Sequence, residues 1–186
     1  KVLVHDGFGP IQYYDGKGQV QGVARDLLSS IAQKAGWTLE YVYADDYSEF
    51  EQALNEGRAD VILSILYDYD AVQRRNVLLS NPYLETESVL VARDGFDMTN
   101  LKGREKAVYM GMRKREDDRT EVRLYGCQEE IINAVERGEC DYTYSNSYTA
   151  SYYLSRNQYE HVAIYPQAGS DSVKYSIGIL RKDDKQ

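Results

Sequence analysis

FEQALNEGRADVI at residues 50–62 and IINAVERGECDYT at residues 131–143 are two versions of one sequence pattern. Each copy follows a stretch with strand character, LEYVYA at residues 39–44 and EVRLYG at residues 121–126. The pattern predicts a strand, a helix, a glycine stop and a second strand, once in each half of the chain. Two similar α/β units suggest two lobes facing each other, and a cleft between lobes is a usual place for a small ligand.

The two copies also share the residues that end the helix and begin the next strand. Gly57 and Gly138 follow the helical stripe, and Asp60 and Asp141 precede the next apolar or aromatic run. A pair of carboxylates invites a catalytic interpretation. The position of both aspartates three residues after a helix-ending glycine favours a structural role shared by the two halves.

Bulk composition excludes several classes of protein. The 186-residue chain has a formal net charge of −8, which argues against non-specific nucleic-acid binding. His5 and His161 are isolated, with no metal-ligand spacing around them. Motifs of dinucleotide, nucleotide-triphosphate, serine-hydrolase and dithiol sites do not occur. We expect no metal, no cofactor and no catalytic residue, and a domain that is not itself an enzyme.

The first half contains two further helix signals. One is an amphipathic stripe made by Val23, Leu27, Leu28, Ile31 and Ala35. Gly36 is a natural stop for that helix. Ser48 and Glu51 have the spacing of a capping box for a second helix, which runs through Leu54.

Strands and helices alternate as strand–helix–strand–helix–strand up to about residue 66, which predicts a parallel sheet with crossover helices. Residues 114–120, KREDDRT, read as a charged loop. No proline-rich or serine-rich linker is present, so strand-like segments near residues 88–94 and 174–180 should connect the lobes.

The two cysteines predict no disulfide. Cys127 and Cys140 flank the helix expected over residues 128–137. A rise of about 1.5 Å per residue separates the two ends of such a helix by more than the roughly 7 Å that a disulfide allows. We expect two free and largely buried thiols.

Several segments together resemble the bacterial extracellular solute-binding proteins of family 3, which have the periplasmic-binding-protein type II fold. They occur in the family's order and cover nearly the whole chain. They are GPIQYYDGKGQVQGVARDLL, FEQALNEGRADVILSI, LLSNPYLETESVLVARDG, NLKGREKAVYMG, ERGECDYTYSN and YSIGILRKDD. The resemblance implies an α/β clamshell of two lobes, each a mainly parallel sheet flanked by helices, with two crossover strands as the hinge. Lobe 1 would be residues 1–91 plus 178–186, and lobe 2 residues 92–177.

The resemblance also implies a set of ligand contacts. Phe8 matches an aromatic floor and Tyr47 a second wall, while Ser64 and Tyr67 match contacts made after the DVIL strand. The second lobe's ligand turn matches two more residues, Met112 and Arg113. Arg113 could supply a cation for an anionic ligand, or it could belong to the solvated charged run.

Two anchors of an amino-acid site differ from the family pattern. The family's carboxylate-binding arginine falls at Gln73 or Val72, depending on the direction of counting, and Arg74 and Arg75 follow. One of these arginines could be rotated into the site, or both could be solvated. Asn146 stands where the family has an ammonium-binding aspartate. These departures imply a different ligand, such as a neutral, anionic or aromatic small molecule, or no ligand at all. The resemblance as a whole implies a small solute that is amino-acid-like or a small organic acid.

Three functions are consistent with the resemblance. The first is an extracytoplasmic sensor domain that binds a small solute between the lobes and signals by lobe closure. Family members that stop near the segment matching RKDD are commonly sensors, so we expect a membrane-anchored receptor remainder such as a histidine kinase. The alternatives are a free solute-binding protein of an ABC transporter and a clamshell enzyme of the cyclohexadienyl dehydratase type. The expected partners are the ligand, the receptor remainder and a second copy in a weak homodimer.

Overall fold

The contacts between residues divide the chain into two compact units. The computed structural model describes residues 1–67, 77–110, 121–167 and 172–181. Unit 1 consists of Lys1–Asp6, Pro10–Glu85 and Val173–Gln186. Unit 2 consists of Gly7–Gly9 and Thr86–Ser172.

Unit 1 contains most of the elements predicted for the first half of the chain. Its helices are α1 (Val23–Ala35) and α2 (Tyr47–Asn55). Its strands are β1 (Val2–His5), β2 (Tyr13–Tyr14), β3 (Val20–Gln21), β4 (Tyr41–Ala44), β5 (Val61–Leu66), β6 (Val77–Leu79) and β12 (Ser172–Leu180). The main sheet of this unit has the order β4-β1-β5-β12, and β6 pairs with β12.

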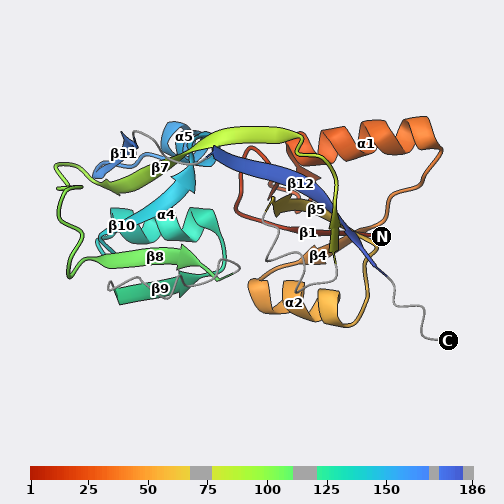
Figure 1. Cartoon of the computed structure of the whole chain (residues 1–186), viewed down its shortest axis with the longest axis horizontal. Helices are drawn as coiled ribbons and strands as arrows, with labels where there is room; N and C mark the ends of the chain where they lie inside the picture. The colour runs from red at the N-terminus through yellow and green to blue at the C-terminus, as the bar shows by residue number, and fades with distance from the viewer. Residues whose placement is uncertain (68–76, 111–120, 168–171, 182–186) are drawn as a thin grey trace. The chain divides into compact units, whose positions relative to one another are not determined.

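Parallel pairing on both sides of β1 organises unit 1. Leu3 lies opposite Val42 on β4 and Ile62 on β5. Both faces of such a sheet must be covered, and the side chains alternate accordingly. Val2 and Val4 join the core with Ala24 and Leu28 of α1, whereas Leu3 joins the core with Phe50 of α2. Figure 1 shows α1 and α2 on opposite faces of this sheet.

The apolar stripe predicted for α1 is wrong as a description of its buried face, because only Leu28 of the five predicted residues is buried. The helix buries Ala24, Leu28 and Ala32. Val23, Ile31 and Ala35 are exposed instead, and Leu27 is half-buried. Two adjacent apolar rows run along this helix, and periodicity alone does not show which row faces the sheet. Gly36 ends the helix in a left-handed conformation, as predicted.

The start of α2 lies two residues earlier than the predicted capping box. Asp46 is the N-cap, and its carboxylate accepts a hydrogen bond from the backbone N–H of Glu49 at 2.8 Å. Glu49 in turn accepts from the backbone N–H of Asp45 at 3.0 Å. This arrangement resembles a capping box, but Glu49 accepts from the N–H of Asp45 rather than from that of the N-cap. Its acidic residues are Asp46 and Glu49 rather than Ser48 and Glu51.

Unit 2 repeats the strand–helix–strand arrangement of β4, α2 and β5 in elements of its own. Its elements are β7 (Leu84–Arg93), β8 (Glu105–Tyr109), β9 (Glu121–Tyr125), α4 (Gln128–Glu136), β10 (Tyr142–Asn146), α5 (Ser147–Arg156) and β11 (Val162–Pro166). Its strands have the order β9-β8-β10-β7, with β11 on the other side of β7. β8 pairs in parallel with both β9 and β10, as β1 does with β4 and β5. The internal repeat predicted from the sequence is confirmed.

The repeated aspartates have matching structural roles. Asp60 accepts a hydrogen bond from the amino terminus of Lys1 at 2.7 Å, and its own N–H donates to the carbonyl of Lys1. Asp141 accepts from the backbone N–H of Glu105 at 2.6 Å, and its own N–H donates to the carbonyl of Glu105. Each aspartate ties the start of the repeated strand to the start of the central strand. The structural interpretation of this pair is confirmed.

The core of unit 2 also lies on both faces of its sheet. α4 and α5 contribute Ile132, Ala150 and Tyr153 to a cluster with Val89 and Val91 of β7. On the opposite face, Leu90 and Ala92 pack with Tyr142, and the partly buried Phe96, Leu101, Tyr144 and Tyr165 complete the cluster.

Both cysteines are free. Cys140 is buried beside α4, whereas Cys127 at the start of that helix is half-buried. The prediction of two free thiols is confirmed. The contact-based units change over at Glu85/Thr86 and Ser172/Val173. The lobe limits expected from the sequence, 1–91 plus 178–186 and 92–177, stay a prediction.

We expect Gly57→Ala and Gly138→Ala each to lower the free energy of unfolding by about 1 kcal/mol, because a left-handed backbone disfavours a side chain. The φ angles are 64° at Gly57 and 72° at Gly138. A methyl group at Gly57 would meet nothing within 4 Å, and one at Gly138 would meet the mobile end of Arg93. Urea denaturation measures the loss.

The matched control for these two variants is Gly16→Ala. That position also has nothing within 4 Å of an added methyl group, and its φ is not positive. Its stability should stay within experimental error of the parent. Equal losses at all three positions would contradict the backbone explanation.

Candidate functional site

The predicted ligand contacts divide between the two units. Ser64, Tyr47 and Tyr67 lie in unit 1, and Phe8 and Asn146 lie in unit 2. The other four predicted contacts, Arg74, Arg75, Met112 and Arg113, lie outside the described residues. The role of all nine residues in ligand binding stays a prediction.

Tyr47 is the first residue of α2 and follows the carboxyl end of β4 by three residues. Its hydroxyl donates to Glu51, one turn later, at 2.6 Å. Its ring is stacked near that of Phe50, with 6.4 Å between the ring centroids. The side chain is therefore held along the helix by one hydrogen bond and one ring contact, with part of its surface open to solvent.

Ser64 and Tyr83 form a hydroxyl pair in unit 1. Their oxygens are 2.8 Å apart, and either group can be the donor. Burial raises the pKa of Tyr83 to about 12, although the bond to Ser64 acts in the opposite direction. The phenol therefore stays neutral at physiological pH. Tyr67 lies just beyond β5, where its backbone N–H donates to the carbonyl of Lys174 and its side chain is 51% exposed.

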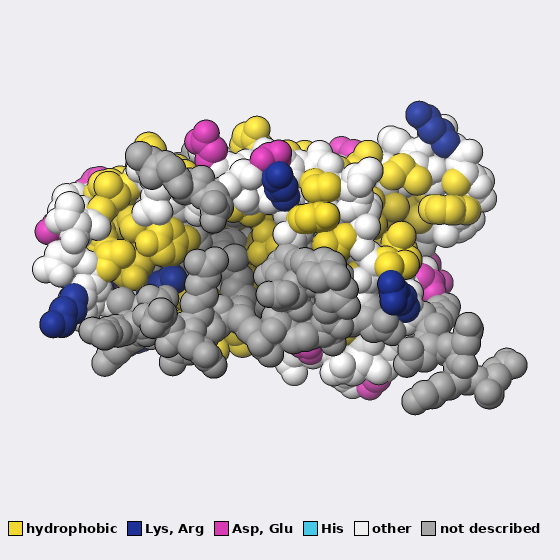
Figure 2. Space-filling model, viewed as in Figure 1, with side chains coloured by type: hydrophobic (Ala, Val, Ile, Leu, Met, Phe, Trp, Pro, Cys, Tyr) yellow, Lys and Arg dark blue, Asp and Glu magenta, His cyan; other side chains and the backbone are white. Residues whose placement is uncertain are grey.

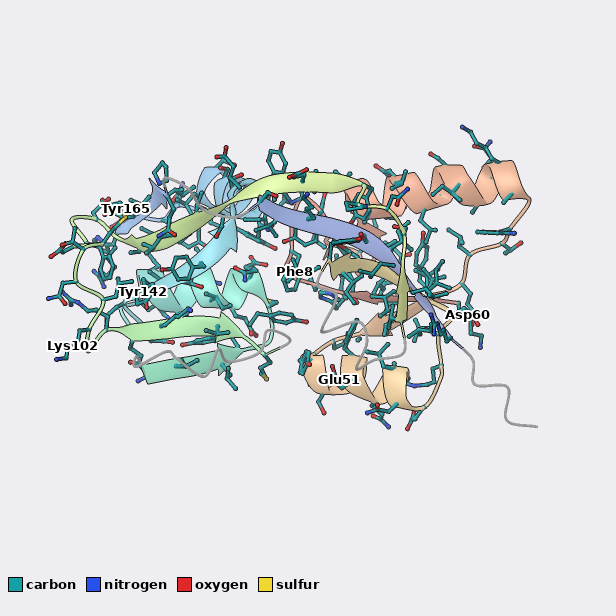
Figure 3. All side chains as sticks on the ribbon, viewed as in Figure 1. Phe8, Glu51, Asp60, Lys102, Tyr142 and Tyr165 are labelled. Carbon is teal, nitrogen blue, oxygen red and sulfur yellow. The ribbon has the colours of Figure 1, made fainter. Side chains whose placement is uncertain are left out.

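Phe8 belongs to a three-residue segment that packs in unit 2. Its ring meets the ring of Tyr109 edge-on, with 5.0 Å between the centroids. Gly7 accepts a hydrogen bond from the backbone N–H of Glu129, and Gly9 donates to the hydroxyl of Tyr153. Figure 3 labels Phe8 on this segment.

Both glycines of this segment are sterically required. A methyl group at Gly7 would collide with the side chain of Cys127, and one at Gly9 would collide with the ring of Tyr152. Gly7 also has a φ of 81°. The backbone of GFG therefore lies close to α4 and α5. A larger residue in place of either glycine would prevent this close approach.

Asn146 is the last residue of β10 and the N-cap of α5. Its side-chain oxygen accepts from the backbone N–H of Thr149 at 2.8 Å, and its side-chain nitrogen donates to the Thr149 hydroxyl at 2.9 Å. The side chain is buried. Asparagine and aspartate are about equally good N-caps, so the local fold accepts the residue that stands in place of the family's aspartate.

Three neighbouring polar residues were missed by sequence reasoning. Buried Thr86 and half-buried Ser147 share a hydrogen bond of 2.7 Å, Ser147 being next to Asn146 in the chain, and Tyr83 pairs with Ser64. Tyr83 closes the SNPY stretch that carried part of the resemblance, so that motif was the available signal. Thr86 and Ser147 are brought together by strand pairing and a helix start, which no spacing in the sequence shows.

The described candidates lie at or near strand ends, three of them in unit 1 and two in unit 2. Phe8, Tyr47 and Tyr67 lie just beyond the carboxyl ends of β1, β4 and β5. Asn146 ends β10, and Ser64 lies two residues before the end of β5. In open α/β sheets, ligands bind outside the carboxyl ends of the strands. In each unit, the candidates carry groups of kinds that can bind a polar solute: hydroxyl and aromatic groups in unit 1, and an aromatic ring and an amide in unit 2.

Other features of the described residues add no competing site. No group of three or more His, Cys, Asp or Glu side chains with metal-binding geometry occurs in the described part of the chain. None of the described helices is long and apolar enough to cross a membrane. Two polar side chains that line an open hollow in unit 2 already make hydrogen bonds within the protein. Glu130 accepts from the backbone N–H of Gly126, and Asn133 accepts from the hydroxyl of Tyr159.

His5 ends β1, three residues before Phe8. Its ring packs edge-on against Phe50 with 5.0 Å between the centroids. Burial lowers the pKa of His5 to about 4, although a backbone hydrogen bond to Asp6 acts in the opposite direction. The imidazole is therefore neutral at physiological pH.

A two-unit α/β fold whose polar groups lie at strand ends defines a class of solute-binding domain. All of the chain, residues 1–186, matches the family described as bacterial extracellular solute-binding proteins, family 3. The chain belongs to that family. The fold predicted from the sequence is confirmed.

Three relatives illustrate the range of the fold. A probable histidine-binding protein of Neisseria gonorrhoeae is 22% identical over 99% of this chain and 72% of its own length. The periplasmic domain of Bordetella pertussis BvgS has a TM-score of 0.82 at 20% identity, over 98% of this chain and 37% of that structure. An ancestral arginine-binding protein bound to arginine also has a TM-score of 0.82, at 22% identity, over 98% of this chain and 84% of that one.

Replacing Asn146 tests its capping role. Asn146→Ala should lower the free energy of unfolding by about 1–2 kcal/mol, because α5 loses its cap. Asn146→Asp keeps the acceptor for the Thr149 N–H and should lose less. Chemical denaturation of both variants measures the difference, and equal losses would show that capping is not what Asn146 contributes.

Lowering the pH should destabilise the domain through His5. The unfolded imidazole binds a proton below its ordinary pKa of 6.5, whereas the folded one does so only near pH 4. The contribution to stability is therefore complete above pH 6.5 and is lost as the pH falls toward 4, by about 3 kcal/mol. Urea denaturation at several pH values, compared with His5→Phe, measures this contribution. An unchanged pH dependence in the variant would rule it out.

Proposed function

We propose that this domain is an extracytoplasmic sensor module that binds a small polar solute between its lobes and signals by lobe closure. The ligand class we favour is an amino-acid-like molecule or a small organic acid. Family membership supports extracytoplasmic solute binding. The sensor role, the ligand class and the attachment to a membrane receptor are the further steps of the proposal.

The observation that carries the proposal is the placement of neutral hydrogen-bonding and aromatic groups at strand ends. Ser64 is paired with Tyr83, and Asn146 is held by Thr149. Groups that a hydrogen bond already orients lose little freedom when a ligand binds, which favours affinity. They have no evident nucleophile or general base among them, which supports a binding function over an enzymatic one.

Two relatives bear on the choice between a sensor module and a free binding protein. The BvgS structure is a periplasmic domain, and the relative from Neisseria gonorrhoeae is a probable histidine-binding protein. This chain covers 37% of that BvgS structure, so the activity of a larger receptor is itself part of the proposal. The alternative is a free solute-binding protein that delivers its ligand to a transporter.

A thermal-shift screen tests ligand binding first. The purified domain is heated with amino acids, organic acids, sugars and nucleosides, each in excess. Ligand at about 100 times Kd adds roughly 2.7 kcal/mol, which should raise the Tm by about 5 °C or more for a chain of this size. A stabilising amino acid or organic acid supports the proposal, whereas no shift with any compound would contradict it.

Ser64→Ala tests whether a confirmed ligand uses the predicted contacts. Loss of one hydroxyl contact should weaken binding by about tenfold in calorimetry. Ser155→Ala is the matched control, because it removes a hydroxyl that is bonded to the carbonyl of Tyr152 on exposed helix surface. Equal affinities in the two variants would remove Ser64 from the site and leave ligand binding itself intact.

A further inference from the structure

α1 presents an apolar row that the core of unit 1 does not use. Val23 is 46% exposed and Ile31 is 38% exposed, and Leu27 between them is half-buried. These three residues are spaced four apart, so they form one ridge along the helix. Trp37, just beyond the helix, is 62% exposed. Figure 2 shows hydrophobic side chains gathered on the visible surface over α1. We call these four residues the α1 patch.

Trp37 is held in a fixed position relative to the helix. Its backbone N–H donates to the carbonyl of Ala32 at 2.9 Å, and Gly36 makes the left-handed turn between them. Tryptophan is highly buried on average and is enriched at the energetic centres of protein interfaces. A tryptophan exposed by almost two thirds, beside an apolar helical ridge, therefore indicates a surface that meets a partner.

The charges beside the patch indicate which partner fits. Asp26, Ser30 and Lys34 form the neighbouring ridge, again four residues apart, with the acid in the first turn and the base in the last. An antiparallel copy of the same helix, related by a two-fold axis near Ser30, would bring Asp26 opposite Lys34 of the second copy, and the reverse. The ridge is complementary to itself rather than to a uniformly acidic or basic partner.

The centre of the ridge suits a close approach. Ser30 is small, and its hydroxyl already donates to the carbonyl of Asp26 at 2.9 Å. Packing against it therefore leaves no hydroxyl without a hydrogen bond. Asp26 also pairs with Arg25 at 2.8 Å on the exposed surface. Exposed pairs of this kind contribute little, so Asp26 can exchange partners at small cost.

We infer that α1 is a self-association surface, through which two copies of this chain form a weak two-fold dimer with antiparallel α1 helices. A two-fold interface uses the same patch on both copies, so its charges and apolar residues must be self-complementary. The α1 patch and the Asp26–Lys34 ridge meet this condition. The inference rests on α1 and Trp37 and does not depend on the ligand.

Two measurements on the unmodified chain test association. Sedimentation velocity from about 10 µM to 1 mM should show a monomer becoming a dimer, a range suited to weak complexes. Trp37 is the single tryptophan of the chain, so its fluorescence reports on this surface directly. Its emission should shift to shorter wavelength as the dimer forms. A monomer with constant emission up to 1 mM would overturn the inference.

Charge reversal tests the antiparallel arrangement. Asp26→Lys alone and Lys34→Asp alone each place like charges opposite each other at both ends of the dimer, and should raise the dimer Kd by about tenfold. An equimolar mixture of the two variants places opposite charges together again and should restore association to within about threefold of the parent. Circular dichroism confirms that both variants remain folded.

Three outcomes would contradict the proposed dimer. Unchanged association of both single variants would move the interface away from α1. A failure of the mixture to recover would exclude the antiparallel geometry. A Trp37 shift that follows the addition of lipid vesicles in a chain that stays monomeric would assign the patch to a membrane surface.

Discussion

Parallel pairing on both sides of one central strand is the constraint on which each unit depends. β1 lies between β4 and β5, and β8 lies between β9 and β10. A strand in that position is hydrogen-bonded to a neighbour along both of its edges. Parallel sheets of this kind are buried on both faces, so both faces need apolar cover. The helices between the strands provide it in unit 1, and in unit 2 two helices cover one face while aromatic side chains fill the other. Asp60 and Asp141 align the strand starts in the same way in both units.

The same arrangement determines where chemistry can occur. Parallel strands bring several chain segments to one edge of a sheet, where the loops that follow are free to carry functional groups. Phe8, Tyr67 and Asn146 occupy such positions, although they are far apart in the sequence. In the proposed site, the ligand contacts would therefore lie at strand ends, whereas the apolar core lies along the strands themselves.

The sequence predicted the repeated architecture because one phrase recurs with its glycine and its aspartate in register. It did not predict which of the two apolar rows of α1 would be buried, since Val23 and Ala24 lie on adjacent ridges of similar hydropathy. It placed the cap of α2 two residues late, because Ser48 and Asp46 are both good N-caps and both have a glutamate three residues later.

The sequence could also predict which segments carry the candidate site residues. The hydrogen-bond partners could not, because they depend on strand register and helix starts. The pairing of Thr86 with Ser147 joins residues 61 positions apart, and that of Ser64 with Tyr83 joins residues 19 apart. Neither pair forms a local motif, and each becomes visible only when the strands are aligned.

Unit 2 is not continuous in sequence, because Gly7–Gly9 belongs to it while the residues on either side belong to unit 1. Three residues near the amino terminus therefore complete the surface of α4 and α5, through contacts that span up to 144 positions. A fragment that began at residue 86 would lack them and would leave the Glu129 N–H and the Tyr153 hydroxyl without these partners. The two units resemble each other, yet neither is a single continuous segment that could be exchanged by itself.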